Sequence, residues 1–100
     1  MPTFPKDWQV DEGGTRVWID VRTRDFADAL SLFAEVGALA EALDHHPDLH
    51  LEAWNRVRLV SYSHDVGHLT ERDERLVAEM DRVLRRRGLL SGGREETRGS

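Results

Sequence analysis

The spacing of apolar residues in this chain switches between two patterns, and each switch determines which type of element can form. Between residues 15 and 23, and again between 55 and 63, apolar and polar residues alternate, as in a strand with one buried face. After each of these segments, apolar residues recur at every third or fourth position, as on a helix that buries one side. The pattern therefore predicts strands and helices that follow one another along a single chain.

Each alternating segment has a neighbour that can pair with it. The first segment places three apolar side chains on one face, namely Val17, Ile19 and Val21. The pair Gly13-Gly14, which tolerates positive φ angles, predicts a turn back from a short strand over Trp8–Val10. The second segment places on one face Val57, Leu59 and Ser61. Its expected antiparallel partner is Asp48–Ala53.

The first helix is expected to begin at Phe26 and to end near residue 43 or 44. Thr23 or Asp25 can cap its first turn. Pro47 is disfavoured inside a helix and restrains the residue before it, so the chain should leave the helix before this point. The predicted buried stripe consists of Phe26, Leu30, Phe33, Val36, Ala40 and Leu43.

The last helix is expected to follow Thr70, whose hydroxyl can cap it, and to stop at Gly88. Its predicted stripe is Leu76, Val77, Met80, Val83 and Leu84. Residues 91–100 lack apolar side chains that could offset the entropy of ordering, which predicts a disordered tail. The expected fold is one α+β domain over residues 1–90, with a four-stranded antiparallel sheet and helices on one face, in the order strand, strand, helix, strand, strand, helix.

The composition argues against several classes of function. Lys and Arg number 14 against 19 Asp and Glu, a formal net charge of -5, which gives no general attraction to nucleic acid. The absence of cysteine excludes disulfides, thiolate nucleophiles and sulfur-bound metal centres. No apolar run reaches the roughly 20 residues of a membrane span, and the opening residues lack the apolar core of a signal peptide. We therefore expect no membrane partner and a cytoplasmic location.

Histidine is the most informative candidate for chemistry. The five histidines fall in two short segments, His45, His46 and His50 in the first and His64 and His68 in the second. Imidazole can give and take a proton near neutral pH, as acid-base catalysis requires, although histidines in surface loops would also explain the grouping. The His-x-x-x-His spacing occurs twice and would suit a metal on a helix, but Pro47 and the strand pattern argue against a helix at either place.

The stretch from Glu41 to Asp73 resembles the signature of the pterin-4a-carbinolamine dehydratase family. That signature has a charged residue four positions before a His-His-Pro triplet, then an aromatic residue, a histidine and an aspartate. These places are filled by Glu41, His45, His46, Pro47, Trp54, His64 and Asp73. The likeness extends to Trp8 and to the helix opening over residues 25–29.

The resemblance implies a hydro-lyase that converts 4a-hydroxytetrahydropterin to quinonoid dihydropterin, with no cofactor and no metal. An acid must protonate the departing 4a-hydroxyl while a base removes the proton on N5. By this resemblance His45 and His64 would be the acid-base pair, and His46 would bind and orient the pterin. The residues that would support or line the site are Glu41, Pro47, Trp8 and Asp73.

Several of these residues also have structural explanations. Asp73 stands three residues after Thr70, so it could serve the first turn of the last helix. Trp8 and Trp54 are expected to pack in the core or in a pocket wall rather than to stack on a ligand. Glu41 could be a solvated residue near a helix end.

The chain departs from the family pattern in two places. The helix that many members carry before the first strand is expected to be absent, and His68 stands where the family usually has glycine, so His68 could modify the pocket.

Two hypotheses for the function remain. The first is a dehydratase linked to an aromatic amino acid hydroxylase. The second is a non-catalytic relative that acts as an assembly or dimerisation factor. In both cases we expect a homodimer or homotetramer, because a domain this small gains stability by burying a sheet edge or a helix face.

Overall fold

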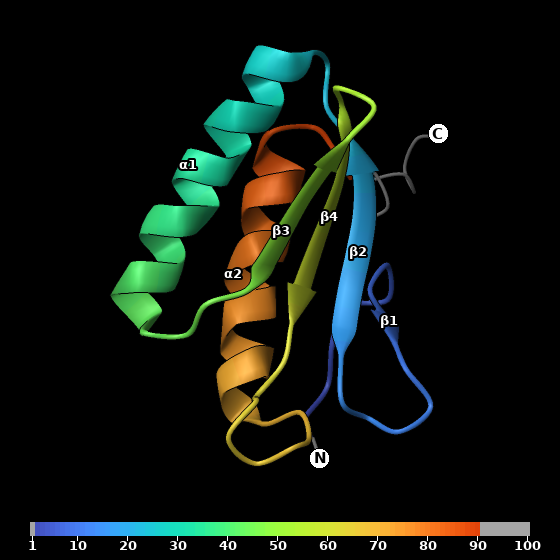
Figure 1. Ribbon diagram of the computed structural model, residues 1–100, viewed down its shortest axis with the longest axis vertical. Helices are drawn as coiled ribbons and strands as arrows, with labels where there is room; N and C mark the ends of the chain where they lie inside the picture. Colours follow the sequence, from blue (N-terminus) through green and yellow to red (C-terminus); the bar gives the residue numbers. More distant parts are fainter. Residues whose placement is uncertain (1, 91–100) are drawn as a thin grey trace.

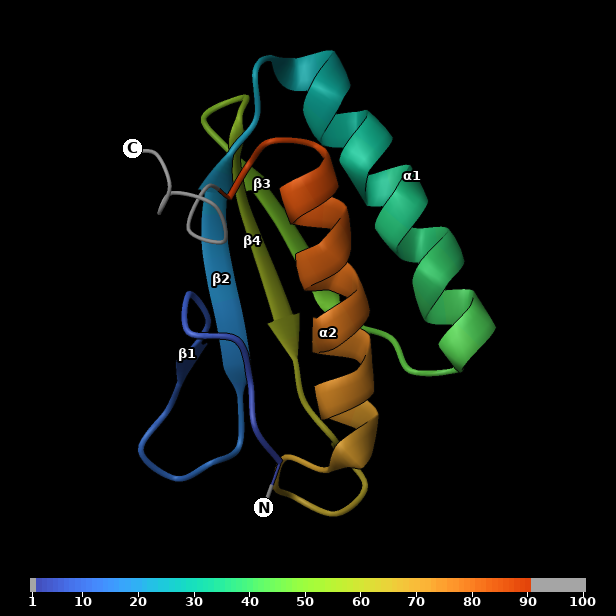
Figure 2. The ribbon, with the colours of Figure 1, turned by 180° about the vertical axis from the view of Figure 1, so that it is seen from behind.

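A computed structural model describes residues 2–90 of the chain, which form a sheet covered on one face by two helices. The elements are β1 (Gln9–Val10), β2 (Val17–Arg22), α1 (Phe26–Leu43), β3 (Asp48–Glu52), β4 (Arg56–Ser61) and α2 (Glu71–Arg86). The strands lie in the order β1-β2-β4-β3, and every neighbouring pair is antiparallel. Both helices lie on the same side of the sheet (Figures 1 and 2). The predicted α+β fold is confirmed.

The two central strands supply the sheet's contribution to the core. In the β2–β4 pair, Ile19 lies opposite Leu59 and Val21 opposite Val57, so the apolar faces predicted from the alternation coincide. These residues are almost fully buried and pack against the apolar face of α2. The inward face of β4 continues to Ser61, which is completely buried although it is polar. This polar end of the core lies where β4 approaches the beginning of α2.

Helix α1 begins and ends where the sequence predicts, but its first half buries a different stripe. The Asp25 carboxylate caps it by accepting a hydrogen bond from the Asp28 amide at 2.8 Å. Phe26 and Leu30, expected in the core, are 51% and 49% exposed. Val36 and Ala40 are buried as predicted, and Phe33 and Leu43 pack partly buried against the core, but in the first half of the helix the buried positions are Ala29 and Leu32. The prediction is wrong for the first half of the stripe. The helix itself carries apolar residues on several sides, so the spacing of these residues does not identify which side faces the core.

Two turns place residues other than glycine in the left-handed region. Asp44 ends α1 with φ 54°, and its amide donates to the carbonyls of the last helical turn, which directs the chain toward His45. In the hairpin between β3 and β4, Ala53 has φ 47° and Trp54 has φ 59°. Trp54 is 59% exposed, so the prediction that it packs in the core or a pocket wall is wrong. The aromatic side chain lies at the tip of a tight connection, which keeps it away from the core.

Helix α2 begins with a capping box. The Thr70 side chain accepts from the backbone of the first turn, and the Asp73 side chain accepts from the Thr70 amide, as the spacing of these residues predicts. Of the predicted stripe, Leu76, Val77, Met80 and Leu84 are fully buried. Gly88 follows the helix with φ 78°. The predicted disordered tail, residues 91–100, lies outside the described residues.

Candidate active site

Four segment ends, which belong to two separate stretches of the chain, meet at one end of the molecule. They are the end of α1, the beginning of β3, the end of β4 and the beginning of α2 (Figure 1). His45 comes from the loop after α1, and Asp73 comes from the first turn of α2. Ser61 is the last residue of β4, and Ser63 lies two residues beyond it. The sheet pairing holds the ends in place, because Asp48 at the start of β3 lies opposite Val60 near the end of β4.

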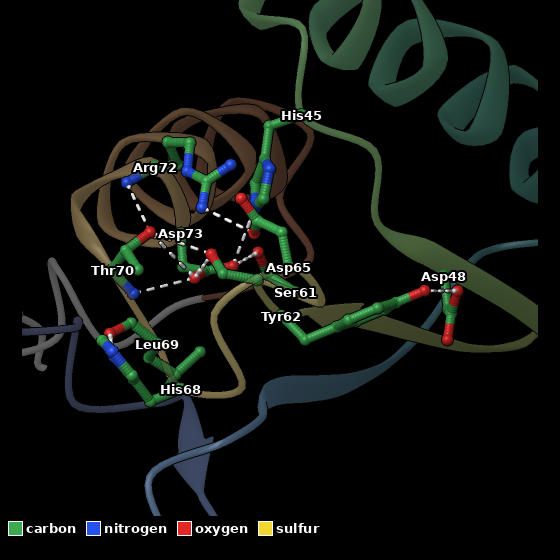
Figure 3. Close-up of polar contacts among 11 residues, drawn as sticks. His45, Asp48, Ser61, Tyr62, Asp65, His68, Leu69, Thr70, Arg72 and Asp73 are labelled. Carbon is green, nitrogen blue, oxygen red and sulfur yellow. Dashed lines mark hydrogen bonds and ion pairs between the residues drawn. The ribbon is translucent and has the colours of Figure 1, made fainter.

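Asp73 is the centre of this meeting point. Its side chain is fully buried and accepts hydrogen bonds at both oxygens (Figure 3). Oδ1 accepts from the Ser61 hydroxyl at 2.6 Å and lies 2.9 Å from Nε2 of His45. Oδ2 accepts from the Thr70 amide at 2.9 Å and from the Ser63 hydroxyl. One carboxylate thus joins the loop after α1, the end of β4 and the cap of α2.

The surroundings of Asp73 favour its ionised form. Burial by itself would raise the pKa of this carboxyl group, but the hydrogen bonds from Ser61, Ser63, His45 and Thr70 together lower the pKa below its usual value. The N-terminus of α2 adds a positive dipole end at the same position. The two explanations that the sequence left open for Asp73, a helix cap and a support for histidine, are therefore both realised by the same side chain.

The two adjacent histidines lie in different surroundings. The His45 side chain is only 11% exposed and is held by Asp73. The His46 side chain is 59% exposed, and its Nε2 lies 2.6 Å from Glu41 in the last turn of α1. Pro47 follows directly and is half-buried, so the chain leaves the helix at the position that the sequence predicts. The pair therefore offers one fixed imidazole and one that solvent reaches.

His64 lies beside the same cluster but has no hydrogen bond of its own among the described residues. It follows Ser63, which binds Asp73, and its ring meets the Tyr62 ring edge-on with a centroid separation of 6.4 Å. The Tyr62 hydroxyl donates to Asp48 at 3.1 Å, and this contact raises the pKa of Tyr62. Two residues just before His64 therefore connect it to the segment carrying His45, Tyr62 through Asp48 and Ser63 through Asp73. The exposed His64 ring is left free to meet a ligand.

Two predicted residues lie apart from this cluster. His68 is exposed, and its Nδ1 lies 3.0 Å from the carbonyl of Leu69, in the loop that leads to α2 (Figure 3). Trp8 is 5% exposed in the core, and its indole NH donates to Asp81 at 3.0 Å. Asp81 lies eight positions after Asp73 on α2, or roughly 12 Å along the helix axis at 1.5 Å per residue. The structure thus places Trp8 in the core, beside Asp81 rather than beside the histidines.

Sequence reasoning did not identify Ser61 and Ser63 as part of the site. Both are buried, at 0% and 2% exposure, and both bind the same carboxylate. A signal was available, because serine replaces an apolar residue at two successive inward positions of the alternation that begins at Val57. Buried hydroxyls require partners, so two of them in succession indicate a polar group on the facing element.

A hollow of about 750 Å³ lies elsewhere, over the face of the sheet that the helices leave uncovered, and none of the predicted site residues lines it. Its lining is charged, with Arg58 bound to Asp20 by two hydrogen bonds at 2.7 and 2.9 Å. Within residues 2–90, no group of three or more His, Asp or Glu side chains is arranged to hold a metal ion. No helix in the same range combines the length and the apolar character needed to cross a membrane.

The fold and the site define a class of small α+β domain in which a buried carboxylate at a helix N-terminus holds a histidine from a His-His-Pro loop. The sequence model of the family described as Pterin 4 alpha carbinolamine dehydratase matches residues 2–83. The chain belongs to this family.

Individual relatives agree with this assignment. A protein of Sinorhizobium fredii with the provisional name pterin-4-alpha-carbinolamine dehydratase is 37% identical over 76 residues, which cover 76% of this chain and 71% of that protein. The mitochondrial pterin-4-alpha-carbinolamine dehydratase 2 of Arabidopsis thaliana is 40% identical over 62 residues, covering 62% of this chain and 33% of that longer protein. A crystal structure from Brucella melitensis, described as a transcriptional coactivator/pterin dehydratase, superposes with a TM-score of 0.69 at 30% identity, covering 77% of this chain and 81% of that one.

Proposed function

We propose that the protein dehydrates a 4a-hydroxytetrahydropterin to the quinonoid dihydropterin, with histidines as the acid and the base. The observation that carries this proposal is the His45–Asp73 contact of 2.9 Å, because it fixes one imidazole of the family signature while 11% of that side chain stays exposed. Family membership supports the dehydratase reaction, and the histidine geometry supports the acid-base mechanism.

The reaction requires two proton movements on one flat ring. The bond between C4a and the hydroxyl oxygen breaks while an acid protonates that oxygen, so that water leaves. A base removes the proton from N5, and the electron pair of the N–H bond forms the double bond between N5 and C4a. In our proposal His45 and His64 perform these two steps, one on each side of the ring, which is the type of proton transfer that imidazole performs well near neutral pH.

The remaining signature residues have supporting roles in this proposal. His46 binds and orients the pterin, and Glu41 holds the exposed His46 ring from the last turn of α1 at 2.6 Å. Pro47 ends the helix so that both histidines project from a loop. Asp73 fixes His45. His68, in the loop that follows His64, would modify the access to the site.

A spectroscopic dehydration assay on freshly generated 4a-hydroxytetrahydropterin tests this mechanism. His45→Ala and His64→Ala should each lower kcat/KM by about 10²–10⁴-fold, because general acid-base assistance has this size. His50→Ala, which removes an exposed histidine on β3, is the matched control and should retain activity. Rates that are equal in all three variants and in the wild-type protein would remove the histidines from the mechanism.

A second candidate function is a non-catalytic assembly or dimerisation factor. Two observations support this second function. The Brucella melitensis structure is described as a transcriptional coactivator/pterin dehydratase, and the apolar residues Phe26 and Leu30 on α1 are exposed. This function predicts partner binding that survives the His45→Ala and His64→Ala substitutions. The dehydratase function predicts that turnover is lost in these variants.

The biological setting of the proposed reaction follows from its chemistry. The substrate is the product that an aromatic amino acid hydroxylase leaves from its pterin, so we propose that the protein supports such an enzyme by recycling the pterin. We also propose a homodimer or homotetramer as the working form and the cytoplasm as its location. Copurification of a hydroxylase activity, or its stimulation by the purified protein, tests the first of these points.

A further inference from the structure

The two oxygens of Asp73 are used differently by the groups around them. Oδ1 is shared by Ser61 at 2.6 Å and His45 at 2.9 Å. Oδ2 is shared by Ser63 and the Thr70 amide. Three of these four groups can act only as donors toward a carboxylate, since they are two hydroxyls and a backbone NH. The carboxylate is therefore held in one orientation by donors from the end of β4, from the segment after it and from the N-cap of α2, and His45 meets an oxygen whose direction is already set.

This arrangement determines where the proton of His45 lies. An ionised carboxylate only accepts hydrogen bonds, so the ring nitrogen facing Oδ1 must carry hydrogen, and that nitrogen is Nε2. In the neutral ring the other nitrogen, Nδ1, is then bare. Among residues 2–90, Nδ1 of His45 has no hydrogen-bond partner, and the side chain keeps 11% of its surface exposed. Nδ1 is thus the atom that remains free to accept a proton from a ligand or return one to it.

We propose that Ser61 and Ser63 are positioning residues that lock neutral His45 in its Nε2–H form, so that Nδ1 is the atom that exchanges a proton with the substrate. The inference rests on the proposed dehydratase function for the identity of the substrate, but the position of the proton is a property of the protein alone.

The serines matter because Asp73 has an alternative state. Without two hydroxyl donors, the buried carboxyl group can turn, or take up a proton and donate it to Nε2. His45 would then carry its hydrogen on Nδ1, and the atom facing the ligand could no longer act as a base. A histidine in the wrong tautomer can cost several orders of magnitude in rate even when the geometry is intact. The serines therefore act on the chemistry through Asp73, without contact with the ligand.

Nitrogen-15 NMR of the histidine side chains in the full-length protein measures the tautomer directly, with the His45 signals assigned from their loss in His45→Ala. At a pH where the ring is neutral, the wild-type protein should show hydrogen on Nε2 and a bare Nδ1. The double variant Ser61→Ala/Ser63→Ala should show a mixture of tautomers. Asp73→Asn retains a capping side chain and offers an amide NH₂ to Nε2, so it should shift the hydrogen to Nδ1. Ser31→Ala, a remote serine on α1, should leave the His45 signals unchanged.

The kinetic measurement uses the same proteins. If the proposal holds, the double serine variant loses about tenfold or more in kcat with little change in KM, because an imidazole in the wrong state impairs the chemical step and not the binding of the ligand. Hydrogen on Nδ1 in the wild-type protein would overturn the proposal, as would a double variant with unchanged tautomer and unchanged kcat. If the double variant does not fold, the tautomer and kcat of the single variants Ser61→Ala and Ser63→Ala decide. A wild-type protein with no turnover would contradict the proposed function, whereas the tautomer would still decide the role of the serines.

Discussion

Nε2 of His45 lies 2.9 Å from Oδ1 of Asp73, and this contact joins two residues that are 28 positions apart. The same carboxylate binds the Thr70 amide and so caps α2. The local stability of the first turn of α2 and the orientation of His45 therefore depend on one side chain. Experiments that change this side chain should affect folding and the site together.

Asp73→Ala should lower the free energy of unfolding by about 2–4 kcal/mol. The substitution removes a helix cap and leaves the buried hydroxyls of Ser61 and Ser63 without their acceptor. Urea unfolding followed by circular dichroism measures the change. The control is Asp65→Ala, in the loop before α2. This substitution breaks an exposed ion pair with Arg72 of α2 and should leave the midpoint nearly unchanged. Equal midpoints in the two variants would contradict the central role of Asp73.

The stability of the protein should fall on acidification, in part because of Asp73. Its pKa in the folded protein is lower than the usual carboxyl value, so the unfolded chain binds the proton more tightly. The stabilisation is therefore complete above the ordinary pKa of about 4 and is lost as the pH falls through the lower folded value. Unfolding free energies measured from about pH 6 to about pH 2 should decline less steeply in Asp73→Asn. If the unfolding free energies of the two proteins fell in parallel, another group would be responsible for the loss of stability at low pH.

Tyr62 is the only tyrosine of the chain, so its ionisation can be followed without interference from other tyrosines. The hydrogen bond to Asp48, the negative charge of Asp48 and partial burial all raise its pKa. Ultraviolet titration of the tyrosinate should therefore give a midpoint above the usual value of about 10. Asp48→Asn should bring the midpoint back toward that value. A midpoint that does not respond to this substitution would mean that Asp48 does not hold Tyr62 in solution.

Trp8→Phe should destabilise the protein by about 1–2 kcal/mol, because the buried Asp81 loses a hydrogen-bond donor at 3.0 Å. Trp18→Phe is a suitable comparison. Trp18 is half-buried on the uncovered face of the sheet, where the Arg58 guanidinium lies 5.8 Å from its ring centroid. Thermal unfolding of both variants should show the larger loss for Trp8. The reverse order would indicate that packing on the outer face of the sheet contributes more than the indole hydrogen bond.

The outer side of α1 should mediate self-association if the protein is an oligomer. Phe26 and Leu30 are about half exposed there, one helical turn apart, and large apolar side chains at the surface of a small domain gain stability when a partner covers them. The double variant Phe26→Glu/Leu30→Glu should therefore have a lower molecular mass in sedimentation equilibrium than the wild-type protein. Val66→Glu changes another exposed apolar residue, in the loop before α2, and should leave the mass unchanged. An unchanged mass in the double variant would place the interface elsewhere.

The elements of this fold could be predicted because their signals are local. The alternation around Ile19 and Leu59, the caps at Asp25 and Thr70, and the break before Pro47 each depend on a few neighbouring residues. The choice between two apolar sides of α1 is not local, since it depends on how α2 and the sheet pack against it. The exposure of Phe26 and Leu30 could not be inferred from periodicity for this reason.

The candidate site, like the fold, could be predicted only in part from the sequence. The signature identified His45 and Asp73 but not that they touch, because the contact depends on the crossing of the loop after α1 over the first turn of α2. Ser61 and Ser63 continue the inward positions of the alternation that begins at Val57, but that pattern alone shows only that they need a polar partner and not which one. Their role is apparent only when the acceptor on the facing helix is known. The contact between His46 and Glu41 spans a single helix end, but the signature did not indicate that these two side chains touch.

The hairpin between β3 and β4 holds two residues in a strained backbone conformation. Ala53 and Trp54 both adopt backbone angles that suit glycine, and each pays a steric penalty of about 1 kcal/mol for its β-carbon. Changing Ala53 to glycine would relieve part of this penalty at a tip far along the sheet from the histidines. Glycine also adds about 0.4–1 kcal/mol of conformational freedom to the unfolded chain, so the two effects nearly cancel and Ala53→Gly should leave both the stability and the chemistry of the opposite end nearly unchanged.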